Sequence, residues 1–294
     1  MSDSHALTIA MAQYGQLAVG ERFERFADSV RSIVEQSPGQ RPDIVVFPEM
    51  HLFGTGDADR DAARRMQAAA TTNLHDGLTD ELAALARECG IWLIPGTVCE
   101  SNPSGDDYNT ALVFSPSGEL AASYRKICPW RPYEWYTPGD SFTVFEIPGI
   151  GCIGLTICYD AWFPEISRQV AWMGAELIIN LVRTTTPDRA QELVLARANA
   201  IVNQTALISL NAAAPQGVGR SIVVDPEGSV IAETEDDRET LLFTTIDFDA
   251  IRNVREHGTA GLNRPWQQFR HSDGIIPLPM YDGCINADTW KPRR

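Results

Sequence analysis

The sequence predicts an α/β fold made of one domain. Short apolar runs typical of buried β-strands alternate along the chain with stretches whose apolar residues recur at helical spacing. This alternation is typical of α/β proteins with a mixed sheet or sheets. No linker rich in serine, glycine or proline divides the first 250 residues, and no internal repeat is present. We therefore expect a single domain.

In the N-terminal half, the pattern predicts four strands and two helices. The first helix depends on Phe23, Phe26 and Val30, which recur every three or four residues. Pro48 is expected to end the second strand, and Gly90 to cap the second helix. The predicted strands cover residues 7–13, 43–47, 91–98 and 111–114, and the predicted helices cover residues 21–35 and 79–89.

In the C-terminal half, the pattern predicts seven strands and two helices. The Asp-Pro-Glu-Gly sequence at 225–228 predicts a turn that joins two strands into a hairpin. Asp188 is expected to cap the longer helix. The predicted strands cover residues 142–147, 152–157, 177–181, 205–210, 220–224, 229–233 and 241–246, and the helices cover residues 164–173 and 188–202.

The last part of the chain has a different composition. From about Asn253 it is rich in glycine, proline, tryptophan and charged residues and has little periodicity. We expect a domain over residues 1–252 and a C-terminal tail over residues 253–294. The tail is expected to wrap the surface or a partner subunit.

The composition excludes several classes of partner and site. A net charge of −15 argues against nucleic acid or an anionic membrane as the partner. The start of the chain lacks the basic segment of a signal peptide, and no apolar run is long enough to cross a bilayer. The six cysteines lack CxxC pairs, which favours free thiols in a reducing compartment, so we expect a cytoplasmic protein. The five scattered histidines do not support a zinc site.

Cys158 is the candidate nucleophile. It lies in the run GLTICYDAWFPE, between an apolar strand and a predicted turn and helix. Such a strand-to-helix elbow holds a nucleophile at the edge of a sheet, where backbone N–H groups can face a reacting carbonyl. A buried core cysteine is the alternative interpretation of this residue alone.

Lys126 stands out because the chain uses arginine almost everywhere else. Of the 24 basic residues, only Lys126 and Lys291 are lysine. Lys126 lies among apolar and aromatic neighbours in YRKICPW. A compact ammonium group can point at one developing oxyanion, which is a reason to prefer lysine to arginine there. The alternative is a lysine whose amine reaches solvent from the end of a strand.

Glu49 is the candidate general base. It follows the strand at 43–47 through Pro48, in the run FPEMHLFG. A carboxylate just past a buried strand, among apolar residues, is suited to proton transfer near neutral pH. His51 is interpreted as structural, because no other histidine lies at a suitable spacing. For a single glutamate, a helix or turn cap is the alternative.

The three runs, in this order, resemble the signature blocks of the nitrilase superfamily of carbon–nitrogen hydrolases. The resemblance covers roughly residues 6–247 and implies a Glu-Lys-Cys triad of Glu49, Lys126 and Cys158. It also implies an α-β-β-α sandwich of two sheets between helices, usually assembled into dimers or larger homo-oligomers.

The lysine block extends into YRKICPWRPYEWYTPGD, which is similar to the aliphatic amidases and formamidases. This resemblance implies that Glu134 is a second active-site glutamate and that Trp130 lines the acyl pocket. The alternatives are an exposed loop residue for Glu134 and ordinary core packing for Trp130. The chain departs from the aliphatic amidases at Met50, where they have tyrosine. It also has Tyr159-Asp160 after the nucleophile instead of two aspartates. Nitrilases typically have Cys-Trp-Glu at this point, which disfavours nitrile hydrolysis.

The resemblance implies hydrolysis of a small linear amide to an acid and ammonia through a thioester on Cys158. Glu49 takes the thiol proton, while the Lys126 ammonium and the backbone N–H of Tyr159 hold the oxyanion. No cofactor or metal is expected, because an adjacent base activates the thiol.

Two alternatives stay open at this point. An N-carbamoyl amino acid amidohydrolase needs a cation for the substrate carboxylate, and Arg183 in NLVRTTT is the candidate clamp, unless it pairs with a surface carboxylate. A catalytically silent scaffold on the same fold is the other alternative, and the intact triad argues against it.

Overall fold

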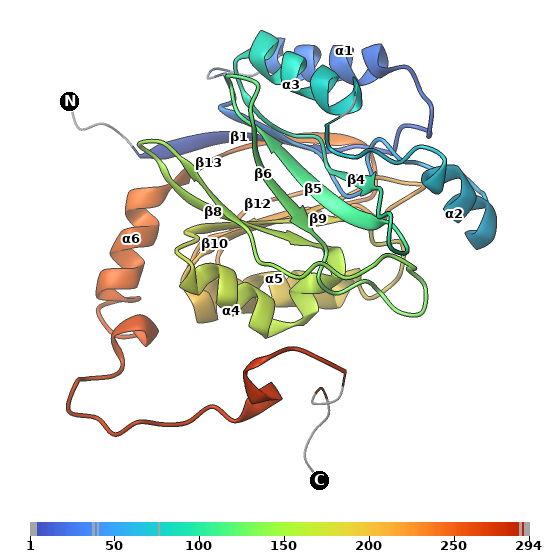
Figure 1. Ribbon diagram of the computed structural model, residues 1–294. Coiled ribbons are helices and arrows are strands. Elements are labelled where there is room, and N and C mark those ends of the chain that lie inside the picture. The colour runs from blue at the N-terminus through green and yellow to red at the C-terminus, as the bar shows by residue number, and fades with distance from the viewer. Residues whose placement is uncertain (1–4, 37–38, 40, 76, 288–289, 291–294) are drawn as a thin grey trace.

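The computed structural model describes residues 5–36, 39, 41–75, 77–287 and 290 of the chain. Two β-sheets lie face to face, and helices cover the outer face of each sheet (Figure 1). This arrangement confirms the predicted α-β-β-α sandwich in a single domain. None of the described helices is both long and apolar enough to cross a bilayer.

The strands are β1 (Ala6–Gln13), β2 (Ile44–Val46), β3 (Trp92–Ile94), β4 (Thr97–Glu100), β5 (Tyr108–Phe114), β6 (Leu120–Arg125), β7 (Val144–Ile147), β8 (Gly151–Ile157), β9 (Leu177–Val182), β10 (Ala206–Asn211), β11 (Ile222–Val224), β12 (Val230–Glu233) and β13 (Thr240–Asp247). The α-helices are α1 (Phe23–Glu35), α2 (Arg60–Ala68), α3 (Gly77–Cys89), α4 (Pro164–Trp172), α5 (Arg189–Asn203) and α6 (Phe248–His257), and the 3₁₀ turns are η1 (Cys158–Trp162), η2 (Pro265–Gln267) and η3 (Met280–Gly283).

Each sheet has parallel strands at its centre. The first sheet runs β13-β1-β2-β3-β5-β4, with β6 paired to β5, and β1, β2 and β3 are parallel. The second sheet runs β12-β11-β10-β9-β8-β7, and β8, β9 and β10 are parallel. The carboxyl ends of parallel strands meet at one edge of a sheet, which is where α/β folds bind ligands.

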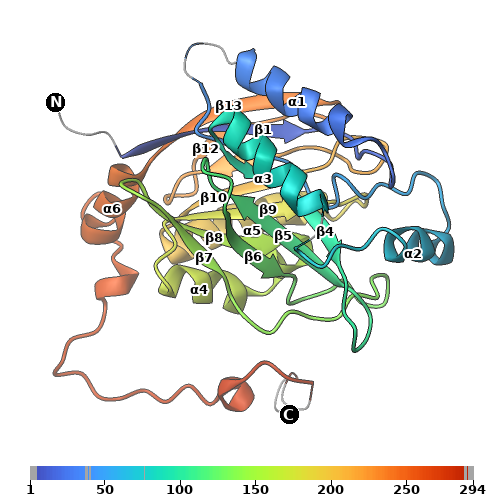
Figure 2. The same ribbon diagram turned by 45° about the horizontal axis from the view of Figure 1, so that its top comes forward.

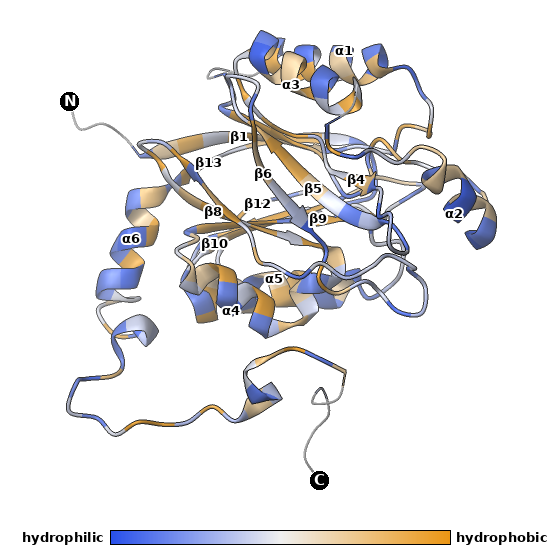
Figure 3. Cartoon of the chain, in the orientation of Figure 1, coloured by the Kyte–Doolittle hydropathy of each residue, from blue (hydrophilic) through white to orange (hydrophobic). Residues whose placement is uncertain are grey.

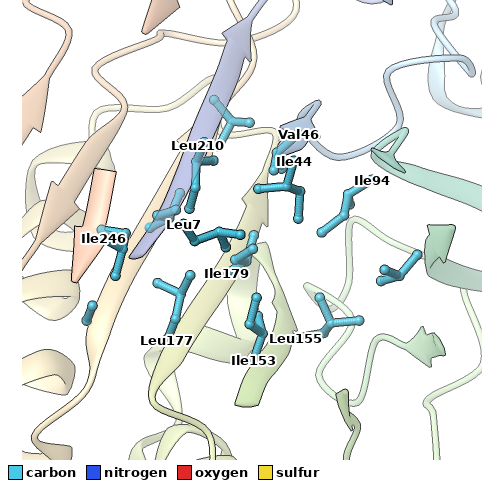
Figure 4. Close-up of a cluster of buried hydrophobic side chains, with 14 of the residues drawn as sticks. Leu7, Ile44, Val46, Ile94, Ile153, Leu155, Leu177, Ile179, Leu210 and Ile246 are labelled. Atoms are coloured by element: carbon cyan, nitrogen blue, oxygen red, sulfur yellow. The ribbon is translucent and has the colours of Figure 1, made fainter. Parts of the chain in front are cut away.

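The main core lies between the two sheets. Because side chains alternate along a strand, Leu7 and Ile9 of β1 belong to the core shared by the sheets, whereas Ala10 and Ala12 belong to the cluster under the helices. Figure 4 shows Leu7 beside Ile179 of β9 in the shared core. The central strands are therefore buried on both faces, which explains their nearly continuous apolar runs.

The outer helices each cover one sheet with an apolar stripe. Helices α1 and α3 lie side by side over the first sheet (Figure 2), where Phe26 packs against Phe47 and Leu82 belongs to the same cluster. Helices α4 and α5 cover the second sheet, and Ala196 and Ala200 of α5 belong to the cluster with Ile178. Burial of each large aliphatic side chain contributes about 1.5–3 kcal/mol, so these stripes hold the helices to the sheets.

Several predicted elements need correction. The expected strand at 91–98 is two strands, β3 and β4, because Pro95 lacks an N–H and Gly96 has a φ of +95°. Asp188 stands at the N-cap of α5, but its carboxylate accepts from Thr186 and makes no cap hydrogen bond. The predicted hairpin is confirmed: Asp225 and Ser229 close the turn between β11 and β12.

Three elements were not predicted. Helix α2 combines strongly hydrophilic residues with alanines and a methionine (Figure 3), and Gln67 is its buried residue. Strand β6 is buried only at Tyr124. Helix α6 is capped by Asp247, whose carboxylate accepts from the backbone of the first turn, and it ends before Gly258. The expected boundary between residues 252 and 253 falls inside α6.

Beyond α6 the chain is extended and mostly exposed, and it passes below α4 (Figure 1). The Trp266 indole N–H donates to the Asn203 carbonyl over 3.0 Å. The Tyr281 hydroxyl donates to Glu165 of α4 over 2.8 Å. This part of the chain therefore contacts the end of α5 and the start of α4 at two separate points.

Candidate active site

The residues singled out in the sequence follow the ends of strands in both sheets. Glu49 comes after β2 and Lys126 directly after β6, both in the first sheet. Cys158 comes directly after β8 and Arg183 directly after β9, in the second sheet. The site therefore joins the two sheets at the carboxyl ends of these strands.

Lys126 lies between two carboxylates and is buried. Its Nζ donates to Glu49 Oε1 over 3.0 Å and to the two carboxylate oxygens of Glu134 over 3.0 and 2.8 Å. Its side chain is 0% exposed. Burial acts to lower the pKa of Lys126, but the charges of Glu134 and Glu49 outweigh burial and hold that pKa well above its usual value. The ammonium is therefore charged at neutral pH.

Glu49 is fixed by two donors to the same oxygen. Asn109 of β5 donates from Nδ2 to Glu49 Oε1 over 2.8 Å, beside the donation from Lys126. Met50 follows with a φ of +57°, and its backbone N–H donates to the Thr97 hydroxyl over 3.0 Å. Glu49 thus has polar partners that its apolar sequence neighbours do not suggest, and Oε2 forms no hydrogen bond with any residue that the structure describes.

Glu134 is held by the loop that follows Lys126. The Trp130 backbone N–H donates to Glu134 Oε2 over 2.6 Å, and Arg131 donates to the Glu134 carbonyl over 3.1 Å. Burial would raise the pKa of Glu134, but the Lys126 ammonium outweighs burial and lowers it. Glu134 is therefore an anion paired with the Lys126 ammonium.

Cys158 begins the 3₁₀ turn η1 with a φ of +48°. A left-handed backbone is unfavourable for a residue with a side chain, so the surrounding structure must impose this elbow. Burial raises the pKa of Cys158 well above its usual value, and the charge of Glu49 adds to this, although Lys126 acts in the opposite direction. The side chain is therefore a thiol at neutral pH and needs a base to become a nucleophile.

Asp160 links the elbow to the lysine segment. It is fully buried and accepts from the backbone N–H of Ile157 over 3.0 Å, from that of Cys128 over 2.8 Å, and from the Tyr124 hydroxyl over 2.7 Å. Burial raises the pKa of Asp160 to about 6, although these hydrogen bonds and Lys126 act to lower it. One carboxylate therefore connects β8 with β6 and with the loop after Lys126.

The remaining predicted residues surround this cluster. Tyr159 lies in the first turn of η1, where backbone N–H groups have no acceptor within the turn. The Trp130 ring packs on Tyr133 with ring centroids 4.4 Å apart. Arg183 is half-buried, and its charge acts to lower the pKa of Glu134. It forms no hydrogen bond or ion pair with any residue that the structure describes.

The structure adds residues that the sequence did not single out. Asn109 contacts Glu49 directly, Asp160 accepts from the Cys128 backbone in the loop after Lys126, and Thr184 Oγ1 lies 3.8 Å from Cys158 Sγ. A buried asparagine in the apolar run of β5 is a weak signal that could have indicated Asn109. Thr184 lies in a run of three threonines, where nothing in the sequence distinguishes it from its neighbours.

Several known proteins are similar to this chain. Residues 8–256 match the model of the carbon-nitrogen hydrolase family. A formamidase from Bradyrhizobium sp. (strain ORS 278) is 31% identical over 265 residues, covering 85% of this chain and 75% of the relative. The omega-amidase NIT2 of Xenopus tropicalis is 35% identical over 195 residues, covering 60% of this chain and 69% of the relative.

A solved structure of an amidase is also similar. It is a glutamate-to-leucine mutant of the amidase from Nesterenkonia sp. AN1, which shows covalent addition of the acetamide moiety of fluoroacetamide at the active site cysteine. The TM-score is 0.69 at 25% identity, and the match covers 90% of this chain and 98% of that chain.

Proposed function

The chain belongs to the carbon–nitrogen hydrolase family, and from that premise we propose that it hydrolyses a small linear amide with Cys158 as nucleophile. It is a hydrolase of carbon–nitrogen bonds other than peptide bonds. The proposal adds the residues that carry out the reaction. In it, Glu49 is the general base, Lys126 stabilises the oxyanion, and Glu134 positions Lys126.

The buried contact of Lys126 with two carboxylates carries this proposal. A lysine that only stabilised the fold would gain little from burial between two anions, because desolvation of the charges offsets their attraction. A fixed ammonium beside a thiol has a chemical use, since it can stabilise a negative oxygen in a site with little water. Cys158, Glu49 and Glu134 each act to raise the pKa of this amine.

In the first half of the proposed reaction, Glu49 takes the proton of the Cys158 thiol and the sulfur attacks the amide carbonyl carbon. The carbonyl electron pair moves to the oxygen, which the Lys126 ammonium and the Tyr159 backbone N–H hold. Each such donor contributes about 3 kcal/mol to the transition state. Glu49 then gives its proton to the departing nitrogen, ammonia leaves, and an acyl thioester stays on Cys158.

In the second half, Glu49 takes a proton from water and the resulting hydroxyl attacks the thioester carbonyl. The same two donors hold the second oxyanion. When the carbon–sulfur bond breaks, Glu49 returns its proton to the sulfur and the acid leaves. One carboxylate therefore serves as base and acid in both halves, and the side chains account for every proton transferred.

A short pulse of substrate followed by acid quenching and mass spectrometry tests the nucleophile. We expect an acyl adduct on Cys158, loss of ammonia release in Cys158→Ala, and normal release in Cys128→Ala, a half-buried cysteine of the neighbouring loop. Cys128, Cys152 and Cys158 lie on one tryptic peptide, because Pro132 follows Arg131 and prevents cleavage there, so fragmentation must locate the adduct. Normal ammonia release from Cys158→Ala would reject the proposed nucleophile.

Arg183 supports a second candidate, an amide or ureido substrate that carries a carboxylate. This half-buried guanidinium has no hydrogen-bond or ion-pair partner among the described residues, and its charge acts on Glu134. An unpaired arginine at a site is suited to bind a carboxylate with two hydrogen bonds. N-carbamoyl amino acids and the monoamides of dicarboxylic acids both present such a group.

Paired substrates distinguish the two candidates. Butyramide and the monoamide of succinic acid are similar in length and differ in the distal carboxylate. If Arg183 is a clamp, Arg183→Ala should raise KM for the acidic amide about tenfold or more and leave butyramide unchanged. Arg238→Ala, at an exposed arginine, is the matched control. Equal losses on both amides would reject the clamp and favour the neutral amide.

We also propose a homodimer or larger homo-oligomer in which the tail of residues 253–294 contacts its own surface or a partner subunit. Exposed apolar side chains on the outer helices α4 and α5 support it: Trp172 is 71% exposed and Val194 is 66% exposed. Met173, Ile201 and Val202 on or beside these helices are exposed as well, and large exposed apolar patches, unlike single residues, commonly mark interfaces. The six free cysteines support the further proposal of a reducing, cytoplasmic compartment.

A further inference from the structure

A second set of polar contacts reaches the sulfur of Cys158 and has no part in the reaction described above. Thr184 Oγ1 lies 3.8 Å from Cys158 Sγ, within hydrogen-bond distance for sulfur. The same hydroxyl donates to Glu192 Oε1 over 2.8 Å. Arg189 Nη1 donates to the other Glu192 oxygen over 2.9 Å. A chain of contacts thus runs from the nucleophile to a buried ion pair.

The number of protons available determines which group donates in each hydrogen bond between Cys158, Thr184 and Glu192. A threonine hydroxyl has one proton and two lone pairs. The Glu192 carboxylate can only accept, so the Thr184 proton is used on Glu192. Thr184 therefore presents a lone pair to Cys158, and the proton in their contact must come from the thiol. A thiolate at Cys158 would find no donor in Thr184.

Further hydrogen bonds hold the side chains of this contact series in fixed positions. Arg189 is 1% exposed, and it also donates to the Ser209 side chain and carbonyl and to the Arg220 carbonyl. The Thr184 backbone N–H donates to Asn211 over 2.8 Å. Thr184 and Glu192 are themselves buried. The hydroxyl cannot turn toward the sulfur without leaving a buried carboxylate oxygen unsatisfied, which is costly.

We propose that Thr184 accepts the hydrogen bond of the Cys158 thiol in the free enzyme, with Glu192 and Arg189 as the positioning pair that fixes the Thr184 hydroxyl. The free enzyme thereby stores its nucleophile as a thiol, which resists oxidation and alkylation better than a thiolate does. The inference rests on the proposed role of Cys158, and it adds a group that opposes ionisation until Glu49 takes the proton.

The charges around Cys158 fit this role. Glu49, Glu192 and Glu134 each act to raise its pKa, after burial as the largest cause, and Lys126 acts to lower it. The charges of Arg189 and Cys158 also act on each other. Glu49 and Glu134 are both hydrogen-bonded to Lys126, whereas Glu192 is paired with Arg189, so the effect of Glu192 can be tested apart from the triad.

Thr184→Val tests the proposal, because valine keeps the shape of threonine and removes the acceptor. The measurement is the rate of iodoacetamide labelling of Cys158 from pH 6 to 10, without substrate. Labelling requires the thiolate. Loss of one hydrogen bond to the thiol should shift the profile toward lower pH by roughly half a unit to one unit. Below the midpoint, labelling should be about three to ten times faster.

Two variants control for shape and for general damage. Thr184→Ser keeps the hydroxyl and should keep the wild-type profile. Thr185→Val changes the adjacent, exposed threonine and should also leave the profile unchanged. Glu192→Gln removes the negative charge and should shift the profile in the same direction as Thr184→Val. If Glu192→Gln fails to fold, the comparison of valine with serine at position 184 still tests whether Thr184 accepts the thiol proton.

An unchanged profile in Thr184→Val, or a shift toward higher pH, would overturn the proposal. So would a serine variant that behaves like the valine variant. The proposed reaction is tested separately by ammonia release from Cys158→Ala. If that variant is active, Cys158 is not the nucleophile, although its labelling can still depend on Thr184. The two failures are therefore distinguishable.

Discussion

At Lys126, an ammonium group lies between the carboxylates of Glu49 and Glu134 with no exposed surface. Lys126→Met would leave two anions facing each other. We expect it to lower the free energy of unfolding by about 3–5 kcal/mol, because it removes one partner of a buried ion pair. Ammonia release should fall below detection. Lys126→Arg should retain more stability but little activity, since a planar guanidinium cannot replace a compact ammonium.

Urea unfolding and ammonia release measure the two effects. Arg25→Met, at an exposed ion pair, is the control and should change stability by less than about 1 kcal/mol. A Lys126→Met protein as stable as the control would mean that the carboxylates do not need the lysine.

Asp160 gives the fold a specific pH dependence. Burial raises its pKa from the usual 3.8 to about 6. A raised carboxyl pKa means that the folded state binds the proton more tightly than the unfolded state does. The stabilisation from Asp160 is therefore full below about pH 4 and is lost as the pH rises through about 6, a difference of roughly 3 kcal/mol.

Asp160→Asn isolates this contribution. Asparagine cannot titrate, and its amide N–H group would face one of the donors that now bind the carboxylate. The variant should be less stable at every pH, and the loss should be larger at pH 4.5 than at pH 7.5. Urea unfolding of both proteins at several pH values measures it. A loss that grows as the pH rises would contradict the raised pKa.

At the residue scale, composition alone drew attention to Lys126, because lysine is so rare in this chain. Cys158 and Glu49 are ordinary residue types and became candidates only through the order of their motifs. Asn109 has only the weak signal of an amide in an apolar strand, and Asp160 and Thr184 could not be predicted, because their contacts exist only when β6, β8 and β9 are brought together.

At the element scale, the turn between β3 and β4 supports the segment that carries Glu49. A Cβ atom added to Gly96 would lie 2.1 Å from the carbonyl oxygen of Pro48, next to Glu49. The φ of +95° at Gly96 is also unfavourable for any other residue. Gly96→Ala should therefore lower the free energy of unfolding by about 2 kcal/mol or more and displace the proposed base.

Gly56→Ala is the matched control for Gly96→Ala. Gly56 also has a positive φ, but nothing lies within 4 Å of an added Cβ atom. The control should lose about 1 kcal/mol of stability through the backbone alone and keep its kcat/KM. Equal losses of kcat/KM in the two variants would mean that contact with Pro48 does not position Glu49.

The elements that sequence patterns predicted best are those with a strong apolar signal. Strands β1, β8 and β9 and helix α1 are buried or strongly amphipathic, and their predicted bounds are close to the observed ones. Helix α2 and strand β6 carry few buried residues, so they lack the periodicity on which prediction depends. Helix α6 is formed by its cap at Asp247 and by packing of Phe248 and Ile251.

For the whole molecule, the alternation of strands and helices was enough to predict an α/β fold in one domain. It could not place the strands in two sheets, because alternation says nothing about which strands pair. The prediction of two sheets depended on the family resemblance. Pairing of β13 with β1, which joins the two ends of the fold, is a contact between residues more than 220 positions apart.

The outer face of α4 and α5 determines the expected assembly. If it is an interface, replacing Trp172 and Val194 with glutamate should convert a dimer or larger oligomer to a smaller species, because buried charges without partners oppose association. Sedimentation velocity measures it. Val230→Glu, at an exposed apolar residue of β12, is the control. A wild-type protein that sediments as a monomer would reject the interface.

The scarcity of lysine has a practical consequence. Between residues 2 and 290, the chain contains a single primary amine, and it is the buried, charged amine of Lys126. Acylating reagents attack neutral amines that they can reach, so acylation of this residue requires the core to open. The amount of modified Lys126 after timed exposure would therefore record how often the native protein opens around its reactive centre. Few proteins permit that measurement without first removing other lysines.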